Sequence, residues 1–146
     1  MKTIRKILVP TDFSPHAEEA FRVALTLAGV VGAHVILFHI ARPPAVVTEG
    51  GRILTDPTHG QAINLWERFQ STPPGAPKVC VEHEVIVADR PGADHVLEIL
   101  DRMECDLIVM GIHGRSWLKH RLFGSVTEEV VRRARCPVIW SSRPRR

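Results

Sequence analysis

The chain has 146 residues, of which 45% are hydrophobic and 24% are charged. This length suits one ordinary domain, and the composition is that of a globular protein rather than a disordered one. No stretch approaches the roughly 18 uninterrupted apolar residues of a membrane span, and the apolar run near the N-terminus is too short for the core of a signal peptide. The sequence therefore argues against membrane and secreted classes.

The formal net charge of +3 comes from the end of the chain. Residues 143–146 contain three arginines, and residues 1–142 hold 16 basic side chains against 16 acidic ones. We interpret residues 1–142 as a single domain and residues 143–146 as a basic C-terminal tail. Such a tail is more often solvated than bound to a polyanion, so the charge pattern argues against nucleic acid as a partner.

The thiols and imidazoles form no sequence motif. The three cysteines are widely spaced and odd in number, which is typical of buried, inert thiols in a reducing cytoplasm: Cys80, Cys105 and Cys136. None of the eight histidines has the spacing of a zinc motif, so no metal site is predicted. Three histidines lie in strand-like runs and are interpreted as structural: His34, His39 and His83.

Five short apolar runs, rich in β-branched residues, predict strands at 6–10, 34–40, 79–87, 106–110 and 136–140. Three of them are continuously apolar, as expected for a parallel sheet that helices cover on both faces. In the run 79–87, valines alternate with glutamates, which indicates a half-exposed strand at an edge of the sheet.

Amphipathic patterns predict helices between these strands, at 15–31, 92–104 and 125–135. Ser14 followed by Pro15 is a typical helix start, because the hydroxyl can cap the helix and proline lacks an N–H that would be unsatisfied there. The proline-rich stretch 41–77 predicts only a short helix at 60–70. The alternation predicts an open, doubly wound α/β sheet with helices on both faces.

Two segments that follow strands have the composition of a ligand site. The first is Pro10-Thr11-Asp12, and the second runs from Gly111 to Ser125. Glycines at 111 and 114 allow the backbone to approach a ligand closely, and a helix that opens at Gly124-Ser125 offers free N–H groups to a phosphate. The loop between them is positively charged through Arg115, Lys119, His120 and Arg121.

A purely structural interpretation of both segments stays open. Ser125-Val-Thr-Glu128 has the pattern of a capping box, which would satisfy the first N–H groups of a helix without any ligand. Asp12 could likewise serve only to form the turn before the first helix. His113 could be a catalytic base, a ribose or phosphate contact, or a solvated side chain.

The spacing Gly111-x2-Gly114-x9-Gly124-Ser125 resembles the nucleotide-binding signature of the universal stress protein family. The likeness extends to residues 6–14, 105–111, 124–131 and 136–139, and only residues 41–77 depart from it. It implies a five-stranded parallel sheet in the order 3-2-1-4-5, a homodimer, and membership of the ATP-binding branch of the family.

The resemblance also implies a role for individual residues. Asp12 would approach the ribose or the adenine, with Pro10 and Thr11 beside it. The adenine would be lined by Ile40 and Met110. The ribose and phosphates would be wrapped by Gly111, His113, Gly114 and Arg115, and the phosphate tail would be held by Gly124, Ser125, Val126 and Thr127.

These features together predict an ATP-binding protein of the cytoplasm that acts in stress adaptation or signalling by nucleotide-dependent binding. The chain lacks a G-x4-G-K-[ST] motif and an acidic pair for Mg²⁺, so any Mg²⁺ would be held mainly by the phosphates, and hydrolysis is expected to be slow or absent. The alternatives are a slow ATPase, with Asp12 or His113 orienting water, and a nucleotide-free protein-interaction module. An unidentified protein partner is expected.

The final strand, residues 136–141, is expected to end the sheet and to form a homodimer by pairing with its copy. Its apolar side chains and the unpaired backbone groups of an edge strand favour this contact.

Overall fold

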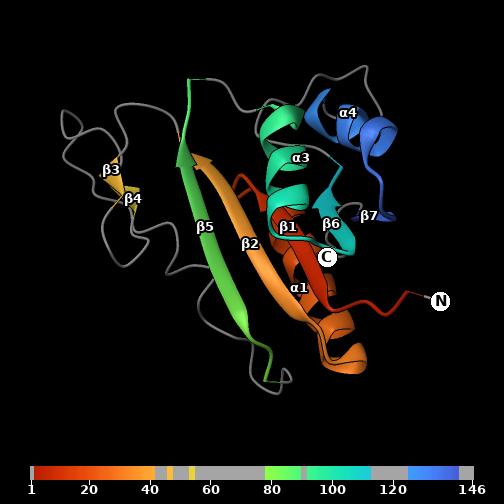
Figure 1. Cartoon of the computed structure of the whole chain (residues 1–146). Helices are drawn as coiled ribbons and strands as arrows, with labels where there is room; N and C mark the ends of the chain where they lie inside the picture. Colours follow the sequence, from red (N-terminus) through yellow and green to blue (C-terminus); the bar gives the residue numbers. More distant parts are fainter. Residues whose placement is uncertain are drawn as a thin grey trace.

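The computed structural model describes residues 2–41, 46–47, 53–54, 78–89, 92–112 and 125–141. Five parallel strands form the main sheet: β1 (Lys6–Thr11), β2 (His34–Ala41), β5 (Val81–Val87), β6 (Leu107–Gly111) and β7 (Val138–Ser141). Their order across the sheet is β5-β2-β1-β6-β7 (Figure 1), which confirms the order 3-2-1-4-5 that the resemblance implies.

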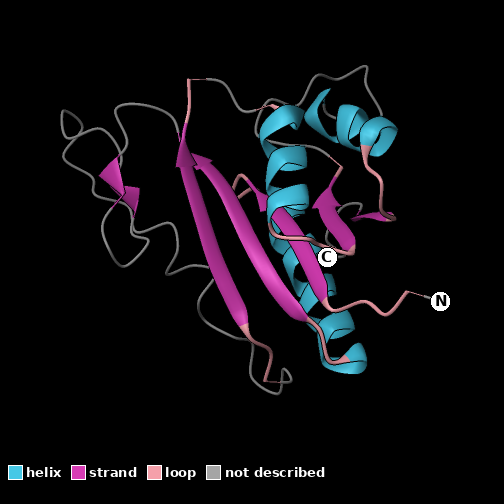
Figure 2. Cartoon of the chain, in the orientation of Figure 1, coloured by secondary structure: helices cyan, strands magenta, loops and turns pink. Residues whose placement is uncertain are grey.

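Three helices accompany the strands: α1 (Pro15–Val31), α3 (Ala93–Arg102) and α4 (Ser125–Arg133). All three match predicted helices, and Figure 2 shows them standing against the sheet. Among the described residues, no helix has both the length and the apolar character needed to cross a bilayer.

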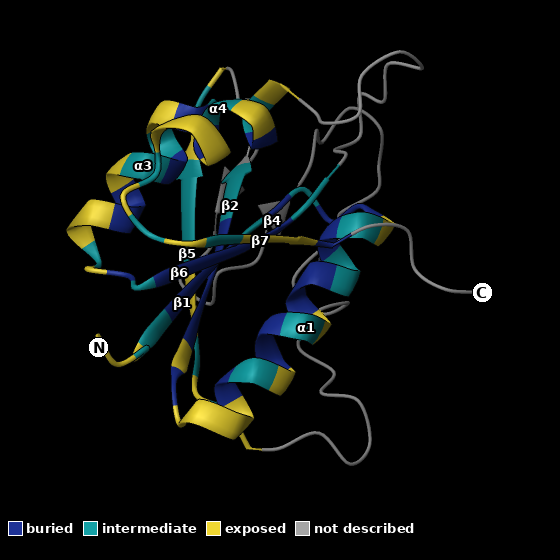
Figure 3. Cartoon of the chain, turned by 90° about the vertical axis from the view of Figure 1, so that its right-hand side faces the viewer, coloured by how far each residue is buried: buried dark blue, intermediate teal, exposed yellow. Residues whose placement is uncertain are grey.

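The helices lie on opposite faces of the sheet, as predicted. Helix α1 covers one face, and α3 and α4 cover the other (Figure 3). One buried cluster centres on Phe21 and Leu25 of α1, and the second joins Ile36 and Phe38 to α3 and to Val130 of α4. Successive residues of β1 and β2 pack into the two clusters alternately, so Ile7–Val9 and Val35–Phe38 are continuously apolar.

The ends of α1 follow the local chemistry of its sequence. The Ser14 hydroxyl accepts a hydrogen bond from the Ala17 N–H at 3.3 Å, and Pro15 occupies the first helical position, which confirms the predicted start. Gly32 ends the helix with a φ of 73°, and its N–H bonds to the carbonyl of Ala28.

The proline-rich stretch contains two short strands that the sequence did not predict, β3 (Val46–Val47) and β4 (Ile53–Leu54), which pair antiparallel. The predicted helix at 60–70 and the tail at 143–146 lie outside the described residues. The alternating strand β5 is at an edge of the sheet, as predicted, and β7 forms the opposite edge.

Candidate functional site

The direction of chain progression reverses at the middle of the sheet. From β1 the chain proceeds outward through β2 to β5, and it then returns to place β6 and β7 on the other side of β1. In open α/β sheets, ligands bind at the carboxyl ends of the strands at such a switch point. The residues at this point are Thr11 at the end of β1, Asp12 directly after it, and Gly111 at the end of β6.

The turn between β1 and α1 is fixed by two side chains that bond to the backbone. The Thr11 hydroxyl accepts a hydrogen bond from the Phe13 N–H at 3.0 Å, and Asp12 Oδ1 accepts one from the Ser14 N–H at 2.9 Å. Between them, the buried Phe13 has a φ of 61°. Positive φ at a bulky residue is a strained conformation of the kind that clusters at functional sites.

Asp12 therefore has a demonstrated structural role as the acceptor of this turn, the alternative that the sequence left open. Its contact with a ribose or an adenine stays a prediction. The side chain is half-buried at the switch point, where a carboxylate could face a ligand.

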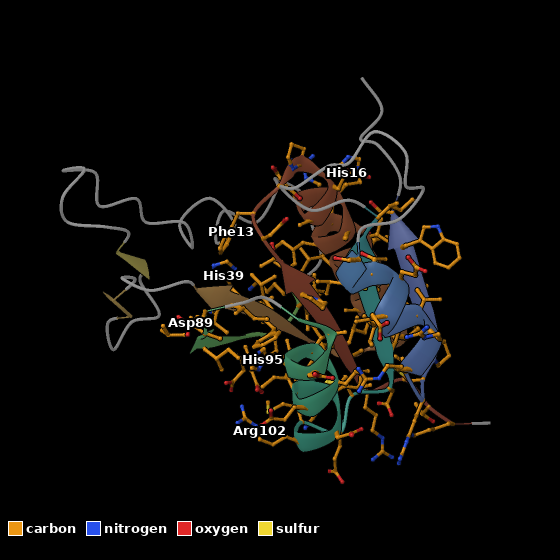
Figure 4. All side chains as sticks on the ribbon, turned by 90° about the horizontal axis from the view of Figure 1, so that it is seen from above. Phe13, His16, His39, Asp89, His95 and Arg102 are labelled. Atoms are coloured by element: carbon orange, nitrogen blue, oxygen red, sulfur yellow. The ribbon has the colours of Figure 1, made fainter. Side chains whose placement is uncertain are left out.

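His39 links the ends of β1 and β2. Its Nδ1 lies 2.8 Å from the carbonyl oxygen of Thr11, and its ring centroid is 4.5 Å from that of Phe13 (Figure 4). A carbonyl can only accept, so Nδ1 carries the proton and donates. The structural role predicted for His39 is thus confirmed, and its bond holds the Thr11 carbonyl in place beneath the turn.

The packing of β6 against α1 requires a glycine at position 111. A Cβ at this position would lie 2.9 Å from the backbone carbon of His16 and 3.0 Å from the nitrogen of Ala17. Only glycine allows the end of β6 to come this close to the first turn of α1. The sequence pattern, which associated this glycine with a ligand, missed this internal reason.

A partly buried hydrogen bond holds the start of α4 against the end of β6. The Thr127 hydroxyl donates to the Gly111 carbonyl at 3.0 Å, and Thr127 is only 4% exposed. Ser125 is exposed at the first position of the helix, and Val126 packs against the α3–α4 core. The amino end of α4 is therefore held beside the switch point.

The remaining predicted residues divide into two groups. Met110 is buried in the α3–α4 core, and Ile40 packs against the same cluster, while Pro10 is half-buried near the end of β1. Four predicted residues lie outside the described part of the chain: His113, Gly114, Arg115 and Gly124. The interpretation of residues 125–128 as a capping box stays a prediction.

Two expectations about individual side chains are wrong. His34 is exposed at the start of β2 rather than structural, and Cys80 is exposed rather than buried. Both lie at the amino-terminal end of the sheet, at or just before the start of a strand. His83 is also largely exposed on the edge strand, and partial burial lowers its pKa.

The other two thiols behave as the sequence predicts. Cys105 is buried, and this burial raises the pKa of its thiol to about 12. Cys136 is half-buried, and desolvation raises its pKa as well. A thiol with a raised pKa is a poor nucleophile at neutral pH, because little of it is thiolate.

An open α/β sheet of this order, with helices on both faces, defines a domain of the doubly wound class. Residues 3–140 match the universal stress protein family. The chain belongs to that family.

Individual relatives agree with this assignment. A universal stress protein of Methanocaldococcus jannaschii is 29% identical, over 97% of this chain and 84% of its own length. One from Mycobacterium tuberculosis is 34% identical over 91% of this chain, which spans only 44% of that longer protein.

Solved structures show the same fold. A universal stress protein from Lactobacillus plantarum superimposes with a TM-score of 0.74 at 22% identity, covering 99% of this chain and 100% of that one. A universal stress protein in complex with cAMP has a TM-score of 0.69 at 25% identity, covering 94% of this chain and 97% of that one.

Proposed function

We propose that this chain is an ATP-binding universal stress protein that acts in stress adaptation or signalling through nucleotide-dependent binding. The observation that carries the proposal is the Thr127–Gly111 hydrogen bond of 3.0 Å, which holds the start of α4 at the switch point of the sheet. The β1–α1 turn with Asp12 lies at the same end of the adjacent strand.

The chemistry of this end of the sheet suits a phosphorylated ligand. The first turn of a helix has N–H groups without helical partners and a partial positive charge, both of which attract phosphate. Arg115, Lys119 and Arg121 in the connecting sequence would add positive charge. The similar structure that contains cAMP supports an adenine nucleotide as the ligand class.

Asp12 is the residue through which we expect the sugar or base to be recognised. Oδ1 accepts the Ser14 N–H, and a carboxylate has further lone pairs with which to accept from ribose hydroxyls. We propose that any Mg²⁺ bound with ATP is held mainly by the phosphates, because the sequence has no acidic pair placed for it.

Substitution Asp12→Asn tests this role without removing the turn, because the amide oxygen can still accept the Ser14 N–H. We expect ATP affinity measured by calorimetry to fall about 10- to 150-fold, equivalent to the ~1.5–3 kcal/mol of a hydrogen bond to a charged group. Asp101→Asn, an exposed change at the far end of α3, should leave affinity unchanged. Equal affinity in both variants would contradict the proposal.

The nucleotide that copurifies with the protein distinguishes the functional alternatives. Purified chain is denatured, and the supernatant is analysed for adenine nucleotides. ATP supports nucleotide-dependent binding, ADP or AMP points to a slow ATPase, and no nucleotide together with no ATP affinity favours the interaction module. We expect turnover well below ~1 per second, the lower end of ordinary enzymes.

We further propose a cytoplasmic homodimer that pairs through β7 and binds a protein partner not yet identified. Ile139 and Trp140 of this edge strand are 38% and 45% exposed, an apolar edge of the kind that templates pairing. The carbonyls of Pro137 and Ser141 accept from β6, so by alternation the backbone groups of Ile139 also face β6. Those of Val138 and Trp140 face outward.

This alternation selects the variant for the dimer test. Trp140→Pro removes an outward N–H and leaves the β6 ladder intact, whereas proline at 139 would break that ladder. Light scattering should give twice the chain mass of 16.3 kDa for the native protein and the mass of one chain for folded Trp140→Pro. A native mass of one chain at micromolar concentration would refute the dimer.

A further inference from the structure

Three side chains with metal-binding atoms meet at the amino-terminal end of the sheet, away from the candidate nucleotide site. They are His34 at the start of β2, Cys80 just before β5, and Glu82 within β5. One donor atom from each, an imidazole nitrogen, the thiol sulfur and a carboxylate oxygen, lies within 4.8 Å of the other two.

The strand register explains why these residues share one place. Val35 pairs with Val81 and Ile36 with Glu82, and the Val35 N–H bonds to the Cys80 carbonyl at 2.9 Å. His34 is therefore opposite Cys80. Paired residues of parallel strands, and residues two apart in one strand, face the same side. His34, Cys80 and Glu82 thus share the sheet face that carries Ile36.

We propose that His34, Cys80 and Glu82 bind a zinc ion. Zinc takes nitrogen, sulfur and carboxylate oxygen together, whereas Mg²⁺ and Ca²⁺ select oxygen alone. Zinc bonds of about 2.0–2.3 Å in a tetrahedron separate the donors by about 3.4–3.7 Å. The donor atoms lie within 4.8 Å of one another, so side-chain rotation would have to bring any two of them closer by no more than about 1.4 Å.

The surroundings permit this adjustment. All three side chains are exposed, so a metal ion can reach them and water can complete the coordination as a fourth ligand. Their backbones are fixed, because the His34 N–H bonds to the Arg5 carbonyl at 2.8 Å and the Cys80 carbonyl is held by Val35. Zinc would bind the Cys80 sulfur as thiolate, and the thiol proton would pass to solvent.

The site is independent of the proposed nucleotide site. β2 and β5 run in parallel (Figure 1), and the three ligands lie where these strands begin, opposite the carboxyl ends that hold Thr11 and Gly111. Zinc would join the edge strand β5 to its neighbour through side chains in addition to the ladder. Because it would bind only the folded sheet, zinc should raise the unfolding temperature.

The experiment uses the full chain, kept reduced with a phosphine and freed of metal. Zn²⁺ alone is titrated by calorimetry, with Cys80→Ser and His34→Gln as test variants. Cys136→Ser, at a thiol outside the cluster, and Glu98→Gln, at an exposed carboxylate on α3, are the matched controls. Without metal, the unfolding temperatures of the two test variants should agree with that of the native chain, since both test positions are exposed.

We expect one zinc per native chain, and at least a ~10- to 100-fold loss of affinity in each test variant, since even outer-shell partners contribute that much. The controls should bind as the native chain does. Co²⁺ as a substitute should give sulfur-to-metal charge-transfer absorption that disappears in Cys80→Ser. No zinc binding by the native chain, or equal binding by native chain and both test variants, would overturn the proposal.

Discussion

Replacing Gly111 with alanine tests the packing that brings β6 against the first turn of α1. The added methyl would lie 2.9 Å from two carbon atoms of His16 and 3.0 Å from the nitrogen of Ala17. Two of these three atoms belong to the helix backbone and cannot rotate away, so the strand or the helix must shift. Overpacking of this kind costs about 1–3 kcal/mol.

For a domain of this size, each kcal/mol lowers the unfolding temperature by roughly 2–4 °C, so Gly111→Ala should unfold about 2–12 °C earlier in calorimetry. Gly92→Ala is the matched control, because a Cβ there has nothing within 4 Å and the backbone φ of −150° suits any residue. The free energy of unfolding of Gly92→Ala should differ from that of the native chain by less than about 1 kcal/mol. Equal stability of the two variants would refute the argument that α1 packing requires the glycine.

Three further predictions concern the N-cap of α1, the Asp106 carboxylate and the three cysteine thiols. Ser14→Ala should lower the free energy of unfolding by about 1 kcal/mol in urea titrations, because the N–H of Ala17 loses its acceptor, while Ser14→Asp should restore much of it. Asp106 Oδ2 accepts hydrogen bonds from the N–H groups of Arg5 and Lys6, and the bond from Arg5 is the main cause of the lowered pKa of Asp106. Asp106→Ala should therefore lower the free energy of unfolding by about 1–3 kcal/mol at pH 7. Because the pKa of Asp106 is lowered in the folded protein, the difference in free energy of unfolding between the native chain and Asp106→Ala should be constant above about pH 5 and shrink as the pH falls through about 4. A difference that grows at lower pH would show that another group is responsible. A thiol reagent at pH 8 should modify Cys80 first, Cys136 more slowly and Cys105 only on unfolding, and rapid labelling of all three would contradict the burial that raises the pKa of Cys105 to about 12.

The sequence was most informative where a local rule determines the backbone. The order of apolar runs and amphipathic patterns predicted the central strands and α1, and Ser14-Pro15 predicted where that helix begins. The alternation of valine and glutamate in residues 79–87 indicated an edge strand, which β5 is. Each of these features depends on neighbours a few residues apart.

The sequence was less informative where distant segments meet. The contact of Gly111 with His16, and the bond from Thr127 to the Gly111 carbonyl, depend on how α1 and α4 pack on the sheet. The cluster of His34, Cys80 and Glu82 depends on strand register, so no spacing motif reveals it. The short strands β3 and β4 have only two residues each, too few to show a period.

The bond between Thr127 and the Gly111 carbonyl also bears on how the family could diversify. This bond joins the two residues that flank residues 112–126, so the positions of Gly111 and Thr127 are set by the fold and do not depend on the intervening sequence. Closure entropy grows slowly with length, by about 0.6 kcal/mol for each doubling. Lengthening the sequence between residues 112 and 125 should therefore add only a closure cost of this order, while the bond between Thr127 and the Gly111 carbonyl stays in place.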